Sequence, residues 1–336
     1  MEERIYFDGA ANITPYKSVL EAIQPLYQAG INNPSSLHKE GLKASILIEN
    51  ARKDIAKILN CKKEEIFFVS SASEAIAWVA KMRKILVHPT SHHAVFESNK
   101  DCNPKLTEKP VIAIPLYDSE TGTRNDLKEF KDNEIFLDLT ASIGKEKINL
   151  KKMKNVKYAC FSAHKFGGIF GAGILYIKKD VQKYIQPLIW GSQENEYRGG
   201  TENVPAIVAM AEALKINNKN FGKYKSHIES MVSYLYDNLK DVCKIRYSSN
   251  TLNITFDNVT AQFAVLVLDK MGVAISAGSA CNSLSVEPSS ILIYRGYSRD
   301  DALKTIRISL SINNTLDECK KFIKVIKNFI DNYDTV

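Results

Sequence analysis

The chain of 336 residues lacks a long apolar run. Its longest, residues 166–177, has twelve residues, five of them glycine or alanine, whereas a membrane-spanning helix needs roughly 18. Residues 2–4 are charged and no apolar signal core follows them, so we expect a cytoplasmic protein without a membrane span. The content of 45% hydrophobic and 25% charged residues excludes disordered and collagen-like chains. It leaves room for one large and one smaller domain.

Closely spaced metal ligands and phosphate-loop motifs are also missing. No two of the six cysteines have CxxC or CxxxC spacing, which argues against a zinc or iron–sulfur site built within the chain. The motifs HExxH and GxxxxGK[ST] do not occur. We expect the following five cysteines to be ordinary structural thiols: Cys61, Cys102, Cys160, Cys243 and Cys319.

Positive charge is in modest excess, because 45 Lys and Arg stand against 38 Asp and Glu, a net charge of +7. The lysine pairs at 62–63, 151–152 and 178–179 are scattered along the chain and do not form one stripe. They are typical of solvated faces, so we expect no direct nucleic-acid binding, although an acidic partner would suit the charge.

Short apolar runs separated by helical or polar segments indicate an α/β protein with a mostly parallel sheet covered on both faces. The expected strands are residues 66–69, 85–87, 111–114, 135–139, 158–161 and 174–177. After residue 206, two helical stretches, 206–216 and 224–239, lead into a compact α+β region. We predict a large domain over residues 13–214 and a small domain formed by residues 1–12 plus 215–336.

Two charged residues follow or end expected buried strands. Lys165 comes just after the strand 158–161 and before a glycine-rich stretch, where partial desolvation would lower its pKa and suit a Schiff base. Asp138 ends another apolar strand, at the edge where α/β sheets bind ligands. The plainer alternatives are a solvated loop lysine and an aspartate that caps a loop.

Three further features have both a functional and a plain explanation. The small residues 70–73 precede a helix and could bind an anion or serve only as an N-cap. His92 could stack on a flat ligand and transfer protons, or lie on the surface. Arg307, in an alternating stretch, could clamp a substrate carboxylate or form a structural salt bridge.

Cys281 differs from the other cysteines because it lies in a small, polar, glycine-containing loop, residues 276–283. Such a loop suits an exposed nucleophilic thiolate. The candidates together match the needs of pyridoxal 5′-phosphate: an anion cup for the phosphate, a lysine for the aldehyde, a carboxylate for the ring nitrogen and a flat group on the ring. An amino-acid substrate needs the arginine, and a thiol acceptor needs the cysteine.

In their order, these segments resemble the class V aminotransferase-fold enzymes, and more narrowly the cysteine desulfurases that feed iron–sulfur cluster assembly. The resemblance covers nearly the whole chain, through YFDGAA at 6–11, NPSSLH at 33–38 and IRISL at 306–310. Its most specific parts are SAHK at 162–165, RGGTEN at 198–203 and SAGSAC at 276–281. The last, with EPS at 287–289, is similar to the long-loop type of active-cysteine segment. The implied fold is the type I fold of pyridoxal-phosphate-dependent transferases.

The resemblance also implies roles for the matching residues. Lys165 would hold the cofactor covalently and move protons, Asp138 would pair with the ring nitrogen, and His92 would stack on the ring. The phosphate would be surrounded by Ala72, Ser73, Ser162, His164 and, from the neighbouring subunit of a homodimer, Thr201. The substrate L-cysteine would be bound by Arg307 and Asn33. Cys281 would attack its sulfur, release alanine and pass the persulfide sulfur to an acceptor or scaffold protein.

Two departures from the family pattern lower the number of protein groups that would hold the cofactor. Ala141 stands where the family has a glutamine that bonds the phenolic oxygen. The family also has an Asn-Asn-Glu strand and its helix between the stacking histidine and the aspartate. The chain runs almost directly from 111–114 to 135–138, so we expect one strand–helix unit, and its asparagine, to be missing.

Other functions stay open at this point. One is another class V enzyme, such as a selenocysteine lyase. Another is a non-catalytic or weakly active desulfurase-like sulfur carrier, which the missing glutamine and asparagine would suit. We favour a cysteine desulfurase for iron–sulfur cluster or other thio-cofactor synthesis, because the lysine, aspartate, histidine, arginine and loop cysteine are all present.

Overall fold

The computed structural model describes residues 4–28, 30, 32–100, 109–278 and 287–334. The chain divides into two compact units. The sheet unit comprises Ile13–Leu116 and Asn125–Phe221, and the C-terminal unit comprises Met1–Asn12, Tyr117–Arg124 and Gly222–Val336. The expected domain boundary at residue 215 therefore lies a few residues before the observed one, which falls between Phe221 and Gly222. The segment Tyr117–Arg124 was placed in the wrong unit, because its hydrogen bonds go to the C-terminal unit.

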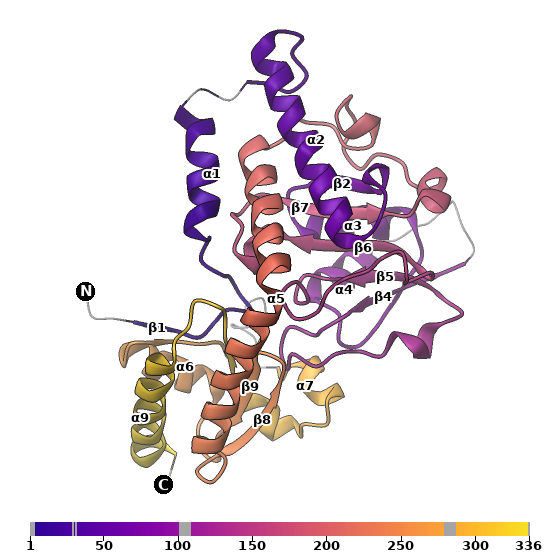
Figure 1. The fold of residues 1–336 in the computed structure, drawn as a ribbon. Helices are drawn as coiled ribbons and strands as arrows, with labels where there is room; N and C mark the ends of the chain where they lie inside the picture. Colours follow the sequence, from indigo (N-terminus) through magenta and orange to yellow (C-terminus); the bar gives the residue numbers. More distant parts are fainter. Residues whose placement is uncertain (1–3, 29, 31, 101–108, 279–286, 335–336) are drawn as a thin grey trace. The chain divides into compact units, whose positions relative to one another are not determined.

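A six-stranded sheet forms the centre of the sheet unit, with the order β2-β7-β6-β5-β4-β3 (Figure 1). Its strands are β2 (Ile66–Val69), β3 (Ile85–Val87), β4 (Val111–Pro115), β5 (Glu134–Asp138), β6 (Val156–Ser162) and β7 (Gly173–Ile177). Strands β3 to β6 are parallel to one another, and β7 is antiparallel to both of its neighbours. The prediction of a mostly parallel sheet is confirmed.

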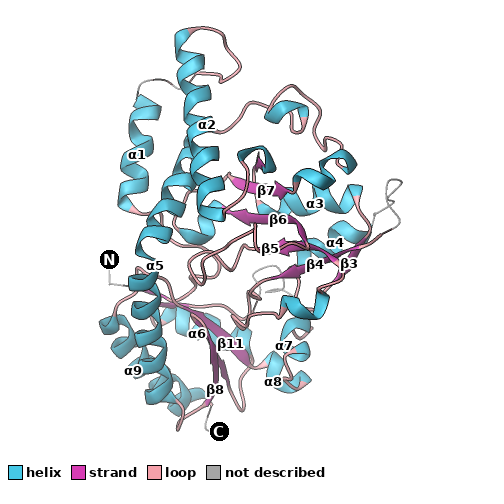
Figure 2. Ribbon diagram, turned by 45° about the vertical axis from the view of Figure 1, so that its right-hand side comes forward, coloured by secondary structure: helices cyan, strands magenta, loops and turns pink. Residues whose placement is uncertain are grey.

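Helices cover both faces of this sheet. Figure 2 shows α3 and α4 on one side and α2 with the first half of α5 on the other. The helices of the unit are α1 (Lys17–Gln28), α2 (Lys39–Leu59), α3 (Ala72–Met82), α4 (His93–Lys100) and the first part of α5 (Val204–Leu239). Short 3-10 turns occur at Lys63–Glu65, Leu127–Phe130, Ala163–Phe166, Lys179–Tyr184 and Glu194–Glu196.

Strand β2 shows why the strands are apolar throughout. Phe67 and Val69 pack with Trp78 of α3 in one buried cluster. Phe68 points the other way, where the Arg52 guanidinium of α2 lies 4.6 Å from its ring centroid. A strand that is covered on both faces needs apolar residues at successive positions, which is the pattern that the sequence has.

The C-terminal unit is an α+β arrangement. Its antiparallel sheet has the order β11-β9-β8, and β1 pairs with β10 in parallel. The strands are β1 (Ile5–Tyr6), β8 (Lys244–Ser248), β9 (Thr251–Thr255), β10 (Val273–Ala274) and β11 (Thr305–Ser309). The helices are the end of α5, α6 (Ala261–Lys270), α7 (Ser290–Tyr294), α8 (Arg299–Leu303) and α9 (Leu316–Tyr333).

Helix α5 is one continuous helix of 36 residues where the sequence predicted two helical stretches. Gly222 lies in its middle, and a side chain added there would meet no atom within 4 Å. An interior glycine costs only about 1 kcal/mol of helix stability, too little to break a helix that packs on both sides of it. No helix in the described part of the chain is long and apolar enough to cross a membrane.

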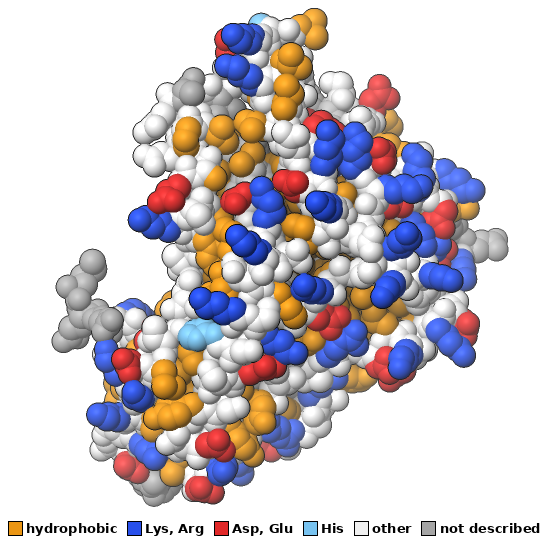
Figure 3. Space-filling view, viewed as in Figure 1, with side chains coloured by type: hydrophobic (Ala, Val, Ile, Leu, Met, Phe, Trp, Pro, Cys, Tyr) orange, Lys and Arg blue, Asp and Glu red, His pale blue; other side chains and the backbone are white. Residues whose placement is uncertain are grey.

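Lys and Arg side chains are spread over the face shown in Figure 3 and alternate with acidic and apolar ones. On this face, the positive side chains are not gathered in one stripe.

Gly173 begins β7 at a place where the backbone is closely packed. A Cβ atom there would lie 2.7 Å from the carbonyl oxygen of Phe161 and 3.1 Å from Cα of Ser71. We expect Gly173→Ala to lower the free energy of unfolding by about 1–3 kcal/mol, as overpacking does. Urea unfolding followed by circular dichroism measures this. Gly222→Ala is the control and should raise stability by about 0.5–1 kcal/mol. Equal effects of the two substitutions would contradict the packing argument.

Candidate functional site

The carboxyl ends of the parallel strands lie along one edge of the sheet. Asp138 is the last residue of β5, and Lys165 lies in the turn that follows its neighbour β6. His92 follows β3 and precedes α4. Because β3, β5 and β6 run in the same direction, their loops emerge together. The structure thus brings these three predicted residues to one edge.

Asp138 is held by its neighbours on both sides. Its Oδ1 accepts a hydrogen bond of 2.8 Å from the backbone N–H of Thr140. Cys160 lies beside it in β6, where complete burial, together with the charge of Asp138 and a hydrogen bond to it, raises the pKa of the thiol well above its ordinary value. Cys160 therefore stays a protonated thiol, and Asp138 keeps a fixed position at the strand end.

Electrostatics link His92 to the other two residues. Burial lowers the pKa of His92, the charge of Asp138 acts against this, and the charge of Lys165 lowers it further. Nδ1 of His92 accepts a hydrogen bond of 3.1 Å from the backbone N–H of Ala94. At neutral pH the imidazole is therefore uncharged with its proton on Nε2, a form that can stack on a ring and accept a proton at a later stage.

The start of α3 is tied to the end of β6. Oγ of Ser162 accepts the backbone N–H of Ala72 at 2.8 Å, and Oγ of Ser71 caps the helix by accepting from Glu74 at 3.3 Å. The backbone N–H of Ala72 thus already donates a hydrogen bond to Ser162 of the same chain. This bond fixes the position of the helix end. Ser73 is exposed in the first turn of α3, where helix N–H groups have no intrahelical partner and favour anions.

His164 follows Ser162 and stacks on Phe170 with ring centroids 4.8 Å apart. Burial, and secondarily the charge of Lys165, lowers its pKa to about 4. Its Nδ1 is buried and has no hydrogen-bond partner among the described residues, and the same is true of Oγ1 of Thr140 beside Asp138. Buried polar atoms without partners are rare in folded proteins. Two of them along the strand-end edge fit a polar ligand bound there.

Ion pairs that the sequence analysis missed hold the segment before α5. Arg198 donates to Glu74 of α3 through Nε at 2.8 Å and Nη2 at 3.2 Å. Buried Arg52 makes a two-point contact with Glu194 at 2.7 and 2.9 Å. Thr201, predicted to reach a neighbouring subunit, is exposed. In the sequence, the one sign of these ion pairs is Arg52, a charged residue on the buried side of a helical pattern.

Arg307 lies in the C-terminal unit and is 3% exposed, so it is more buried than the sequence suggested. Its Nη2 donates to Asp8 Oδ1 at 2.7 Å and its Nη1 to the carbonyl oxygen of Ser119 at 2.9 Å. Its Nε is buried without a partner among the described residues. The backbones of Arg307 and Ser276 exchange hydrogen bonds of 2.7 and 3.2 Å. The start of the loop that contains Cys281 therefore runs beside Arg307, while Cys281 itself lies outside the described residues.

Asn33 lies in the sheet unit, and its Oδ1 accepts the backbone N–H of Ser35 at 2.9 Å in a local turn before α2. The substrate-binding role of Asn33 stays a prediction.

The four described cysteines are free thiols. Burial raises the pKa of Cys61, Cys243 and Cys319 to about 12, as expected for inert structural thiols. Cys102 lies outside the described residues. Among the residues that the structure describes, no group of His, Cys, Asp and Glu side chains is arranged to hold a metal.

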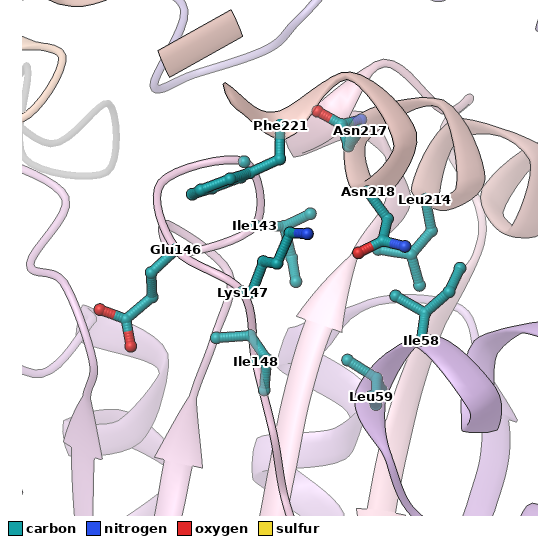
Figure 4. A pocket seen from close by; sticks show the side chains of 11 residues that line it. Ile58, Leu59, Ile143, Glu146, Lys147, Ile148, Leu214, Asn217, Asn218 and Phe221 are labelled. Carbon is teal, nitrogen blue, oxygen red and sulfur yellow. The ribbon is translucent and has the colours of Figure 1, made fainter. Parts of the chain in front are cut away.

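A pocket with about 320 Å³ of empty space opens between the end of α2, the loop 143–148 and α5 (Figure 4). Apolar side chains such as Ile58, Leu214 and Phe221 line it. None of the predicted site residues contributes to its wall, so it is separate from the strand-end site.

Comparisons with known proteins show similarity along nearly the whole chain. The sequence model of the aminotransferase class V family matches residues 5–108 and 99–322. The chain is 30% identical to "Cysteine desulfurase IscS" of Dictyoglomus turgidum, covering 100% of this chain and 97% of that protein. It is 29% identical to the protein of the same name from Methanosarcina thermophila, covering 97% and 92%. A solved "NIFS-LIKE PROTEIN" has a TM-score of 0.87 and 31% identity, covering 98% of this chain and 100% of that one.

The comparisons also show that the chain is shorter than its relatives. The aligned regions of 373 and 384 positions exceed the chain's 336 residues, so the relatives contain additional internal residues. The family model matches the chain in two segments, 5–108 and 99–322, which overlap at 99–108. The expected loss of a strand–helix unit between residues 111–114 and 135–138 stays a prediction. β4 is paired on both sides, by β3 and β5. It leads into the segment Tyr117–Arg124 of the C-terminal unit.

The pKa of His164 predicts a pH dependence of stability. Because its pKa is about 4 in the folded protein and about 6.5 ordinarily, protonation favours the unfolded chain. Its contribution is complete above pH 6.5 and is lost as the pH falls toward 4. We expect the urea midpoint of His164→Gln to fall less between pH 7 and pH 5 than that of the wild type. An identical fall in both proteins would contradict this prediction.

Proposed function

The chain belongs to the class V aminotransferase family, and we propose that it is a pyridoxal-phosphate-dependent cysteine desulfurase. It converts L-cysteine to L-alanine, leaves a persulfide on Cys281 and passes that sulfur to an acceptor protein for iron–sulfur cluster or other thio-cofactor synthesis. The main observation in support of this proposal is that His92, Asp138 and Lys165 lie at the same edge of the sheet, at the carboxyl ends of its parallel strands. The desulfurase names of full-length relatives support it.

The residues of this edge fit pyridoxal 5′-phosphate. Its phosphate would find the start of α3 with Ser73, the tied Ser162–Ala72 pair and the unpartnered Nδ1 of His164. Lys165 would hold the aldehyde covalently. When bound, the cofactor supplies an electron sink for the charge that develops at the substrate's Cα.

The protein's own groups would handle protons and charge. Asp138, fixed by Thr140 and Cys160, would keep its carboxylate paired with the ring nitrogen. The amine of Lys165 would take the proton from the substrate's Cα and return it later. His92, uncharged because burial lowers its pKa, would stack on the ring and assist these transfers.

Arg307 and Asn33 would bind the substrate, with the guanidinium of Arg307 facing the carboxylate. The Cys281 thiolate would form a bond to the substrate sulfur as the bond between that sulfur and Cβ breaks. The electron pair of the broken bond stays with Cβ, which takes up a proton, so alanine leaves and sulfur remains as a persulfide. A second thiol then accepts this sulfur.

We further propose a homodimer in which exposed Thr201 completes the phosphate site of the neighbouring subunit. The paired ions Arg198–Glu74 and Arg52–Glu194 hold the segment that presents it. The four free thiols suit a reducing compartment, so the cytoplasm is the proposed location. Ala141 supplies no side-chain amide to the cofactor, and we therefore propose that the cofactor is held by fewer groups than the family pattern implies.

We expect purified protein to be yellow and to lose its colour on borohydride reduction, with the cofactor mass on the peptide that contains Lys165. With cysteine, the wild type should form alanine and a persulfide on Cys281. Lys165→Ala should form neither, because both the attachment and the proton carrier are lost. Cys281→Ala should form no protein persulfide. Mass spectrometry and amino-acid analysis measure these products.

Cys243→Ala is the matched control, since its thiol is partly buried with a pKa of about 12, and it should behave as the wild type. Colourless protein that takes up no cofactor would reject the enzyme and favour a non-catalytic sulfur carrier. Sulfide release that survives Cys281→Ala under a reductant would indicate a simple lyase. Much faster turnover of selenocysteine would indicate a selenocysteine lyase.

Arg307→Lys tests the substrate-binding role. Lysine keeps the positive charge beside Asp8 but loses the planar two-point geometry, so we expect KM for cysteine to rise about tenfold while kcat changes less. Steady-state alanine formation measures both. An unchanged KM would assign Arg307 to a structural salt bridge.

A further inference from the structure

The turn that contains Lys165 is short and tightly closed. It follows β6 as the 3-10 turn Ala163–Phe166, and Gly167 ends it with a left-handed backbone, at φ 88°. The backbone N–H groups of Gly167 and Gly168 both donate to the carbonyl oxygen of Ala163, the second of them at 3.1 Å. The backbone position of Lys165 therefore depends on the groups that hold this turn in the sheet unit.

The segment before α1 holds the turn through two backbone carbonyl groups. The backbone N–H of Ile13 donates to the carbonyl oxygen of His164 at 3.0 Å. The backbone N–H of Tyr16 donates to the carbonyl oxygen of Gly167 at 3.2 Å. The peptide group that joins His164 to Lys165 is thus fixed by the main chain alone.

A side chain of α5 holds the turn on the other side of Lys165. Asn217 is 6% exposed, and it is labelled in Figure 4. Its Nδ2 donates at 2.8 Å to the carbonyl oxygen of Phe166, and at the same distance to that of Ala213 in its own helix. Its Oδ1 accepts from Oη of Tyr16 at 3.2 Å. Both N–H groups and the oxygen of the amide are used, so the side chain is held in one orientation.

An asparagine on this helix suits such a role for two reasons. Its amide donates and accepts at once, whereas an aspartate of the same shape has no donor for the carbonyl oxygen of Phe166. Helix α5 also gives it a fixed base, because Ala209, Ala213 and Leu214 beside it are buried. A group that projects from a packed helix is placed more precisely than one on a loop.

We propose that Asn217 is a positioning residue that fixes the backbone of the Lys165 turn, and with it the place of the lysine amine at the cofactor's aldehyde and the substrate's Cα. The inference rests on the proposed function, because it takes Lys165 as the group that binds the cofactor and transfers protons. Asn217 acts through the carbonyl group of Phe166 and takes no part in the chemistry itself. Such placement matters because a misplacement of about 1 Å can cost about a hundredfold in rate.

Two variants of Asn217 test the proposal in the cofactor-loaded protein. Asn217→Ala and Asn217→Asp both lose the donor to Phe166, while aspartate keeps the acceptor for Tyr16. We expect both to lower kcat for alanine formation about tenfold and to leave KM for cysteine within about twofold, because the partners of Arg307 are unchanged. Tyr16→Phe keeps the donor to Phe166, so its kcat should fall by no more than about threefold.

Asn155→Ala is the matched control. Asn155 lies just before β6, at the end of that strand opposite to Lys165, and its Nδ2 donates to the carbonyl oxygen of Phe130 at 3.0 Å. The substitution removes the same kind of hydrogen bond from the same unit, so it measures the effect of lost stability alone. It should keep wild-type kcat and KM. Thermal unfolding shows whether each variant is folded.

A second readout needs neither activity nor bound cofactor. Hydrogen exchange of the purified full-length protein, followed by peptide mass spectrometry, reports on the backbone amides of residues 163–168. They should exchange about fivefold faster in Asn217→Ala than in the wild type, because the bond that ties the turn to α5 is lost. Asn155→Ala should leave their exchange unchanged.

Unchanged exchange in Asn217→Ala would overturn the proposal. An unchanged kcat of Asn217→Ala beside an active wild type would do the same, as would an equal loss of kcat in Asn155→Ala. If the wild type forms no alanine while the turn exchanges faster in Asn217→Ala, the proposed function fails and the positioning of the turn by Asn217 stands.

Discussion

The parallel hydrogen bonding of β3 to β6 is the constraint on which the candidate site depends. Parallel strands leave the sheet at the same edge, so residues from distant parts of the sequence meet there without long loops. His92, Asp138 and Lys165 come from three such exits. The antiparallel β7 then returns at this edge beside Ser71, and only a glycine fits at its start. Any change of strand direction or register would separate the lysine from the aspartate.

The sheet and the strand-end residues could be predicted because their signal is local. Six apolar runs gave six strands, with ends differing by at most two residues, since strands buried on both faces must be apolar at every position. The burial of Arg307 could not be predicted this way. Its alternating neighbours suggest one solvated face, yet Asp8 and the segment Tyr117–Arg124 cover it. The cover comes from segments far away in sequence, which no local pattern reveals.

The contacts that the sequence analysis missed share this property. Arg52 and Glu194 are 142 residues apart, and Arg198 and Glu74 are 124 apart. The residues Glu194, Asn195 and Glu196 adopt left-handed backbone conformations, which non-glycine residues rarely do in succession. The buried Arg52–Glu194 ion pair at one end and the two-point Arg198–Glu74 pair at the other stabilise this turn, whose backbone conformation is energetically unfavourable. Unusual backbone of this kind persists where the surroundings force it, as at functional sites.

The candidate site is built on the interior of the sheet, although the chain is shorter than its relatives. Strand β5, which ends at Asp138, and strand β6, which leads into the turn of Lys165, each have a neighbouring strand on both sides. The edge strand that remains, β3, has three residues, and a short edge offers little unpaired backbone to other chains. At the proposed cofactor site, Ala141 stands where the family resemblance implies a glutamine, so that side-chain amide is missing. Under the proposed function, the protein would keep the groups that transfer protons and would lose a contact that tunes the cofactor. Its rate and its affinity for the cofactor are therefore expected to change separately.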